Sequence, residues 1–206
     1  MGKQSNDQKV FVVIINWNGK NDTLACLASL QKIDSNNVNL QIIVVDNGST
    51  DDSLQVIAKK FPQVILIPAG KNLGFTGGNN VGILFALKHG ADFIWLLNND
   101  TFVDRRVLSF LSAFDDPLVG AVGCKIYFAS GHEFHKDRYS QADRGRVIWY
   151  AGGLVDWDNM YASHRGVDEV DKDQYDSNIE TPFITGCSFI VRADVVRRVG
   201  NLDDRY

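Results

Sequence analysis

Apolar runs alternate with amphipathic segments through the first half of the chain. Residues 10–15 are six consecutive apolar positions, mostly β-branched, which is typical of a strand buried on both faces of a parallel sheet. Shorter runs at 41–45, 64–67 and 93–97, apolar except for Gln41, predict three more strands of this kind. Turn-forming residues end each run, so the pattern separates into discrete elements.

Helical periodicity fills the gaps between these strands. Ser49 and Asp52 have the spacing of a capping box for the second helix, and Gly90 suits the C-terminal cap of the third. The alternation predicts an α/β fold with a Rossmann-like, mostly parallel central sheet flanked by helices. The expected helices lie at 24–30, 54–61, 80–89 and 104–114.

The regular alternation stops after residue 128. The acidic stretch 167–178 has no periodicity, and we expect a mobile surface loop there. The remaining expected elements are strands at 119–128, 146–150 and 181–191 and a helix at 193–199.

Length and composition fit one domain of ordinary size. The chain has 206 residues, of which 45% are apolar, enough for a sizeable core. We expect a polar tail at 1–9 and a single domain at 10–206, divided into halves at 10–128 and 129–206. The net charge of −4 argues against a nucleic-acid-binding protein, which needs a basic face.

The sequence shows no targeting signal and no membrane span. Residues 1–9 lack the apolar core of a signal peptide, so a cytoplasmic protein is expected. The cysteines are far apart and lack zinc-site spacing, which favours reduced core thiols. They are Cys26, Cys124 and Cys187.

Polar side chains follow three of the predicted strands. Asn16, Asp46 and the run Asn98-Asn99-Asp100 would meet at one edge of a parallel sheet, where open α/β folds bind ligands. Carboxylate and amide oxygens there suit a hard divalent cation and the phosphates that it carries. Asp46 suits the ring N–H of a pyrimidine base, although strand-end aspartates more commonly satisfy the backbone of a turn.

A Gly-rich stretch at 68–80 leads into the third helix. Gly74, Gly77 and Gly78 would let the backbone approach a ligand, and the helix N-terminus favours negative charge. The glycine spacing matches neither a dinucleotide-binding fingerprint nor a P-loop, which weakens both the dehydrogenase and the NTPase interpretations.

Histidine and tryptophan residues in the second half offer weaker signals. His132, His135 and His164 lack partners at ligand spacing and are expected at the surface. Trp149 and Trp157 fit an apolar platform for a sugar and fit ordinary packing equally well.

Five segments, taken together and in order, resemble the family-2 nucleotide-diphospho-sugar glycosyltransferases of GT-A fold, in particular their rhamnosyltransferase-like branch. The resemblance implies a nucleotide-sugar-binding half at 10–128 and an acceptor-side half at 129–206 that is incomplete at its C-terminus. The matching segments are 12–18, 43–51, 72–80, 96–100 and 185–189.

The resemblance also implies roles for individual residues. Asp46 would read the pyrimidine base, and Asp100 would hold Mn2+ or Mg2+ as the last position of an Asp-x-Asp motif. Asn98 replaces the first acidic residue of that motif, which should lower metal affinity. The implied nucleotide-sugar contacts are Asn16, Asp46, Asn72, Gly74, Gly78, Asn79, Asn98 and Asn99. The implied acceptor-side residues are Trp149, Gly152, Gly153, Gly186 and Cys187.

The resemblance implies an inverting transferase for polysaccharide biosynthesis. The donor would be a dTDP- or UDP-sugar and the acceptor a saccharide or a lipid-linked oligosaccharide, with peripheral attachment to the inner face of the cytoplasmic membrane through later residues. The general base is expected after Tyr206, so no catalytic residue is expected within the chain and this chain would bind donor without turnover. A non-catalytic nucleotide-sugar-binding module is the alternative. A sugar nucleotidyltransferase fits less well, because residues 16–20 lack a Gly-rich basic loop.

Overall fold

A computed structural model of the chain describes residues 8–35 and 38–205. Its backbone forms two compact units, the first made of the described residues up to Ala121 and from Gly186 onward and the second of Val122–Thr185. The predicted division into halves at 10–128 and 129–206 differs in where residues 186–205 fall, and it stays a prediction. Most of the expected tail at 1–9 lies outside the described residues, and the first strand already begins at Gln8.

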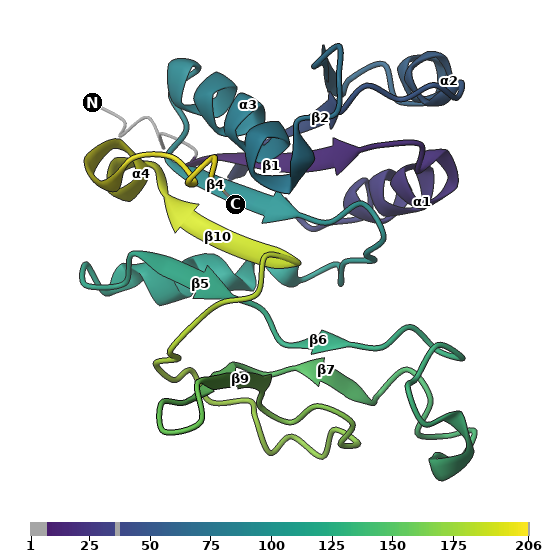
Figure 1. The fold of residues 1–206 in the computed structure, drawn as a ribbon, viewed down its shortest axis with the longest axis vertical. Coiled ribbons are helices and arrows are strands. Elements are labelled where there is room, and N and C mark those ends of the chain that lie inside the picture. The colour runs from purple at the N-terminus through teal and green to yellow at the C-terminus, as the bar shows by residue number, and fades with distance from the viewer. Residues whose placement is uncertain (1–7, 36–37, 206) are drawn as a thin grey trace, which may run out of the picture. The chain divides into compact units, whose positions relative to one another are not determined.

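The largest sheet has six strands in the order β3-β2-β1-β4-β10-β5 (Figure 1). β1 pairs in parallel with β2 and β4, and β2 pairs in parallel with β3. β10 runs antiparallel to β4. This arrangement confirms the predicted α/β fold with a mostly parallel central sheet. The strands are β1 (Gln8–Asn16), β2 (Val38–Asp46), β3 (Ile65–Pro68), β4 (Phe93–Leu97), β5 (Ala121–Gly123) and β10 (Ser188–Arg192).

Helices follow each of the first parallel strands, and α3 lies against β1, β2 and β4 (Figure 1). The buried faces of these elements form a core that includes Val13, Ile43, Ile83 and Leu96. The helices of the first unit are α1 (Lys20–Leu30), α2 (Ser53–Lys60), α3 (Gly74–Lys88), the 3₁₀ helix η1 (Val107–Asp115) and α4 (Ala193–Val199).

The end of α3 matches the expected cap. Gly90 has φ +78°, a left-handed conformation that glycine adopts without steric cost. The Gly90 N–H donates to the Leu87 carbonyl at 3.3 Å and the Ala91 N–H to the Ala86 carbonyl at 3.0 Å, which is the Schellman pattern. The cap turns the chain back toward β4.

The predicted capping box at Ser49 and Asp52 is wrong. α2 begins at Ser53, and no side chain caps its N-terminus. The Ser49 hydroxyl instead accepts hydrogen bonds from the Asn16 side chain at 3.0 Å and the Asn18 N–H at 2.9 Å. Ser49 therefore joins the turn after β2 to the turn after β1, a tertiary task that local spacing does not reveal.

Three other boundaries differ from the prediction. The helix expected at 104–114 is 3₁₀, with the Ser109 N–H donating to the Arg106 carbonyl three residues back. α3 begins at Gly74, so Gly77 and Gly78 lie in the helix and not in the preceding loop. The strand expected at 119–128 is broken between Gly123 and Ile126.

The second unit contains two small antiparallel strand pairs, β6 with β7 and β8 with β9. The hairpin β8–β9 follows Gly152 and was not predicted, because its strands are short and its turn at 157–160 carries no glycine. The elements are β6 (Ile126–Tyr127), η2 (Lys136–Arg138), β7 (Ile148–Tyr150), β8 (Gly153–Asp156) and β9 (Tyr161–His164).

The acidic stretch 167–178 is anchored and does not form the loose loop expected from its composition. Asp171 is buried and forms an ion pair with Lys125, with Asp171 Oδ2 2.8 Å from Lys125 Nζ. Val170 forms an isolated bridge with Val147. Contacts from distant residues thus order a segment whose own sequence has no periodicity.

None of the helices within the described residues has the length and apolar character needed to cross a bilayer.

Glu133 fixes the irregular segment between β6 and β7. Its carboxylate is buried and accepts the N–H groups of Gly131 and Gly145, each at 2.8 Å. Burial would raise the pKa of this carboxyl, but the N–H groups of Glu133, Gly145 and Gly131 outweigh it and lower the pKa below 4.5. The ionised carboxylate is therefore the form that the fold stabilises.

We expect Glu133→Gln to lower the thermal midpoint at pH 7 by a few degrees, because an amide N–H would face a backbone N–H. Since the folded pKa is lowered, the stabilisation is complete above the unfolded pKa and disappears as pH falls through the folded pKa. The difference between variant and wild type should therefore shrink in acid. Differential scanning calorimetry from pH 7 to about pH 3 tests this. Glu180→Gln, at an exposed position, is the control, and equal midpoints at pH 7 would contradict the expectation.

Candidate functional site

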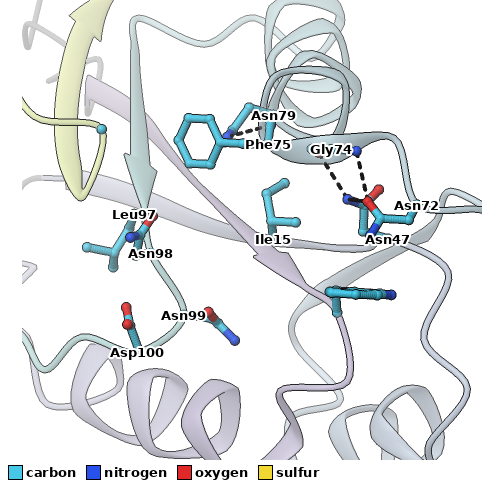
Figure 2. Close-up of a pocket in the computed structure, with 12 residues that line it drawn as sticks. Ile15, Asn47, Asn72, Gly74, Phe75, Asn79, Leu97, Asn98, Asn99 and Asp100 are labelled. Carbon is cyan, nitrogen blue, oxygen red and sulfur yellow. Dashed lines mark hydrogen bonds between the residues drawn. The ribbon is translucent and has the colours of Figure 1, made fainter. Parts of the chain in front are cut away.

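A hollow of about 380 Å³ lies in the first unit, at the carboxyl ends of the parallel strands (Figure 2). In the sheet register Asn16 pairs with Asp46, and Ile14 pairs with Leu97, so the three strand ends meet at this edge. The predicted meeting of polar residues at one edge is thus present. The lining residues are Ile15, Trp17, Asn47, Asn72, Gly74, Phe75, Asn79, Leu97, Asn98, Asn99, Asp100 and Gly186.

The segment after β4 brings Asn98, Asn99 and Asp100 to the hollow (Figure 2). The Asn98 N–H donates to the Cys187 carbonyl at 3.0 Å, and the Thr101 hydroxyl donates to the Asn98 carbonyl at 2.8 Å. These bonds fix the backbone of the segment. Asp100 is exposed and has neither a hydrogen bond nor an ion pair among the described residues, so its carboxylate is free to bind a ligand.

The donor set at Asp100 fits a hard cation of modest affinity. One carboxylate and the amide oxygens of Asn98 and Asn99 are oxygen ligands of the kind that Mg2+ and Mn2+ accept beside phosphates. A single protein carboxylate leaves most coordination positions to water or to a ligand's phosphates. Asp100 and these two amides would therefore hold a metal mainly together with a diphosphate.

The N-terminus of α3 forms the opposite side of the hollow. Gly74 and Phe75, the first residues of this 15-residue helix, line it, and Asn79 donates to the Phe75 carbonyl at 2.9 Å. The Gly74 N–H already donates to Asn72 Oδ1 at 2.8 Å, but a helix N-terminus still carries partial positive charge, which attracts phosphate. The hollow thus pairs a free carboxylate with a helix N-terminus.

Asn47 clamps the loop before α3. Its side-chain Nδ2 donates to the Asn72 Oδ1 and the Gly74 carbonyl, each at 3.0 Å, and its Oδ1 accepts from the Leu73 N–H at 3.0 Å (Figure 2). Asn47 was not predicted as a site residue, although it directly follows Asp46. An amide placed after a strand end was the available signal.

Asn16, Asp46 and Gly78 do not line the hollow. Asn16 and Asp46 are buried and bind each other, with Asn16 Nδ2 donating to Asp46 Oδ1 at 2.9 Å. Ser49 N–H donates to Asp46 Oδ2 at 3.0 Å, so both carboxylate oxygens already accept hydrogen bonds. A Cβ on Gly78 would lie 3.1 Å from Ile15 Cδ1. Direct contact of these residues with a nucleotide stays a prediction.

Two aromatic side chains at the hollow were missed from the sequence. Trp17 is 57% exposed and Phe75 is 50% exposed, although each is large and apolar. Trp17 directly follows the end of β1 and Phe75 lies in the first turn of α3, and these positions are the signal that could have identified them. Exposed rings at a polar hollow suit stacking against a base or a sugar.

The residues implied for the acceptor side divide between the two units. Gly186 lines the hollow, and Cys187 contributes its carbonyl to the Asn98 N–H. Trp149, Gly152 and Gly153 lie in the second unit, where a Cβ on Gly153 would fall 2.4 Å from the Phe183 ring. Their relation to an acceptor stays a prediction.

The rings of the second unit form a packed cluster. Trp149 and His164 lie edge to face with centroids 4.5 Å apart, and the His164 ring nitrogen Nδ1 contacts the Trp149 carbonyl at 3.1 Å. Packing thus accounts for Trp149, whereas Trp157 is 74% exposed. His164 and His135 are half-buried and bonded, which corrects their expected surface position, and His132 is exposed as predicted.

An acidic cluster in the second unit has the geometry of a metal site, formed by Asp171, Asp173 and Asp176. The ammonium group of Lys125 binds two of the three carboxylates, Asp171 and Asp176. These ion pairs hold the Lys125 pKa above its usual range despite burial, which lowers it. The positive charge of Lys125 therefore already offsets part of the negative charge of this cluster.

Cys26 lies beneath the Asn98–Asp100 segment, with its sulfur 3.8 Å from the Asn98 carbonyl. Burial raises the pKa of this thiol to about 11. We expect Cys26 to resist alkylation by iodoacetamide at about pH 8 in the native protein and to react once urea unfolds it, because the thiolate is the reactive form. Peptide mass spectrometry reports the site, and rapid labelling of Cys26 in the native state would contradict the expectation.

The sequence profile described as glycosyl transferase family 2 matches residues 11–200. Galactofuranosyltransferase GlfT1 of Mycobacterium tuberculosis, matched in two strains, is 39% identical over 75 residues, which are 35% of this chain and 25% of that protein. The chain therefore spans far less than the full length of this relative.

Solved structures of glycosyltransferases share the fold. Mannosyltransferase PcManGT from Pyrobaculum calidifontis, in complex with GDP-Man and Mn2+, aligns over 97% of this chain and 49% of its own, with TM-score 0.59 and 17% identity. TarS 1-349 of S. aureus, in complex with UDP-GlcNAc, aligns over 60% of this chain and 36% of its own, with TM-score 0.51 and 24% identity. The rhamnosyltransferase-like assignment finds no support in these relatives. The profile match over residues 11–200 shows that the chain belongs to glycosyl transferase family 2.

Proposed function

We propose that the hollow binds the nucleotide diphosphate of a sugar donor and that the protein transfers the sugar to an acceptor. The observation that carries this proposal is the pairing, in one hollow, of the free Asp100 carboxylate with the N-terminus of α3. A diphosphate with a bound cation is a ligand that satisfies both charges. The family membership supports the same reading.

Each side of the hollow has a distinct task in this proposal. Asp100 and the amides of Asn98 and Asn99 hold the cation, and the first turn of α3 receives the phosphates. Bound Mn2+ or Mg2+ would neutralise the charge that develops on the departing diphosphate. Asn72 and Asn79 offer amides to ribose hydroxyls. The hydrogen bond between Asn16 and Asp46 joins the ends of β1 and β2.

The identity of the donor is also part of the proposal. We favour a UDP- or dTDP-sugar, transferred with inversion to a saccharide or lipid-linked acceptor. The solved relatives carry GDP-Man with Mn2+ and UDP-GlcNAc, which supports a cation-dependent nucleotide-sugar site without choosing the base. The acceptor and the general base stay predictions.

A thermal-shift panel tests donor binding. UDP, dTDP and GDP and their sugars, each with and without Mn2+, should separate the candidates, because a ligand that binds only the native state raises its stability. At a concentration 100-fold above Kd the gain is about 2.7 kcal/mol, or roughly 5–10 °C for a protein of this size. We expect at least one nucleotide to give this shift with Mn2+ and much less with EDTA. No response to any nucleotide would refute the proposal.

A further inference from the structure

We propose that Thr23 and Asn16 are positioning residues that fix the orientation of the Asn99 amide, so that its carbonyl oxygen faces the ligand beside Asp100. The proposal rests on the function proposed above. It adds a specific acceptor atom to the site, Asn99 Oδ1, and a physical device that keeps it in place.

A continuous chain of hydrogen bonds joins the hollow to the buried strand ends. Asn99 Nδ2 donates to the Thr23 hydroxyl at 3.0 Å, and that hydroxyl donates to Asn16 Oδ1 at 2.8 Å. Asn16 Nδ2 then donates to Asp46 Oδ1 at 2.9 Å. These bonds link four separate segments, namely the turn after β4, α1 and the ends of β1 and β2.

The carboxylate at the far end sets the direction of every bond. A carboxylate only accepts, so Asn16 must turn its NH2 group toward Asp46 and its oxygen toward Thr23. The single hydroxyl proton of Thr23 is then used on Asn16, so the hydroxyl accepts from Asn99. Asn99 must therefore point its NH2 group at Thr23, which leaves Oδ1 at the other end of the amide.

Burial makes this order costly to reverse. Asn16 and Thr23 are both 0% exposed, so water does not replace a lost partner. The Ser49 hydroxyl takes the second proton of Asn16 Nδ2, at 3.0 Å. Rotating any one amide would leave two donors or two acceptors facing each other.

Asn99 Oδ1 accepts no hydrogen bond among the described residues, although Asn99 lines the hollow. Figure 2 shows the Asn99 nitrogen pointing away from Asp100. The free oxygen is therefore available to a cation, to a metal-bound water or to a sugar hydroxyl. An inverted amide would present N–H groups, which repel a cation.

Gly19 gives the Asn99 amide the room that this arrangement needs. A Cβ at Gly19 would lie 2.5 Å from Asn99 Nδ2, while the glycine itself has φ −109°, which alanine also adopts. Gly19→Ala should therefore displace the Asn99 amide without straining the backbone. Gly19→Ala thus disturbs the hydrogen bond between Asn99 and Thr23 without changing any of the residues that form the hydrogen-bond chain.

The test measures affinity for the nucleoside diphosphate identified in the thermal-shift panel, by calorimetry with and without Mn2+. Thr23→Val removes the hydroxyl and should weaken Mn2+-dependent binding about tenfold, with a smaller effect in EDTA. Thr23→Ser keeps the hydroxyl and should bind within about twofold of wild type. Gly19→Ala should behave like Thr23→Val, and carries the test if that variant does not fold.

A rescue separates positioning from general loosening. Asn99→Asp places an oxygen at both ends of the side chain, so orientation no longer matters. It is introduced both alone and together with Thr23→Val, and Thr23→Val should no longer weaken Mn2+-dependent binding relative to Asn99→Asp alone. Ser53→Ala removes a hydroxyl that is equally buried but does not belong to the hydrogen-bond chain from Asn99 to Asp46. It should leave the ratio of affinities with and without Mn2+ unchanged.

The outcomes distinguish the two proposals. If wild type binds no nucleotide, the proposed function fails. If wild type binds and Thr23→Val and Gly19→Ala bind equally well with Mn2+, the positioning role is refuted. An equal loss from Thr23→Val in the Asn99→Asp protein would also refute it, because the loss would then arise from general damage to the fold.

Discussion

Gly82→Ala should destabilise the protein by about 2–3 kcal/mol, although alanine is normally the better helix former. Gly82 lies in the middle of α3 on the side that faces β1. An added Cβ would fall 2.2 Å from Cγ1 of Val13, a fully buried residue at the centre of the sheet. The helix must then move away from β1 or Val13 must leave its rotamer, and both changes disrupt a close-packed core. Urea unfolding followed by circular dichroism measures the effect.

A double variant identifies the cause. Val13→Ala alone removes two methyl groups and leaves a cavity, so it should also destabilise. Combined with Gly82→Ala, the new methyl group fills part of that cavity, and the total loss should be smaller than the sum of the single losses. Leu84→Ala, on the exposed side of the same helix, should have little effect. A Gly82→Ala protein more stable than wild type would show that α3 does not approach β1 this closely.

The second large effect is expected at the hollow. Asp100→Ala should weaken Mn2+-dependent nucleotide binding about 100-fold, or about 2.7 kcal/mol, because it removes the carboxylate that we propose binds the cation. Binding in EDTA should change little, since the α3 N-terminus and the amides remain. Asp100→Asn, which keeps the shape and removes the charge, should lose nearly as much. Isothermal titration calorimetry with nucleotide, with and without Mn2+, gives both values.

The reverse change provides the matched control. Asn98→Asp adds a second carboxylate to the same segment and should raise Mn2+-dependent affinity about tenfold. An exposed carboxylate elsewhere in the first unit, removed by Asp115→Ala, should alter neither measurement. Equal Mn2+ dependence in wild type and Asp100→Ala would show that Asp100 does not bind the cation. The hollow would then be a site for the nucleotide alone.

The sequence predicted the regular part of the fold well because β1 and β4 carry their own signal. Their uninterrupted apolar runs require burial on both faces, and the parallel sheet provides it. Signals that depend on distant partners were missed or misassigned. Ser49 looked like a helix cap but bonds to Asn16 and Asn18, and the acidic stretch 167–178 looked mobile but is tied to Lys125.

The sequence predicted which strand ends form the candidate site, but not which of their side chains are buried. Asn98, Asn99 and Asp100 follow a strand directly, so their arrival at the sheet edge follows from local sequence. Asp46 is buried and accepts hydrogen bonds from Asn16, on another strand, and from the Ser49 N–H, and no local sequence pattern predicts this burial. Asn47, Trp17 and Phe75 were missed because amides and rings near turns have many ordinary uses.

The place of β10 has a consequence for how the chain assembles during synthesis. β4 is completed at Leu97, but its second neighbour, β10, begins only at Ser188. Until the ribosome has released that later strand, one long side of β4 presents unpaired N–H and carbonyl groups on a wholly apolar strand. Such non-local pairing slows folding and exposes the nascent chain to aggregation. We therefore expect chaperone dependence to be greatest for nascent chains that end between these two strands.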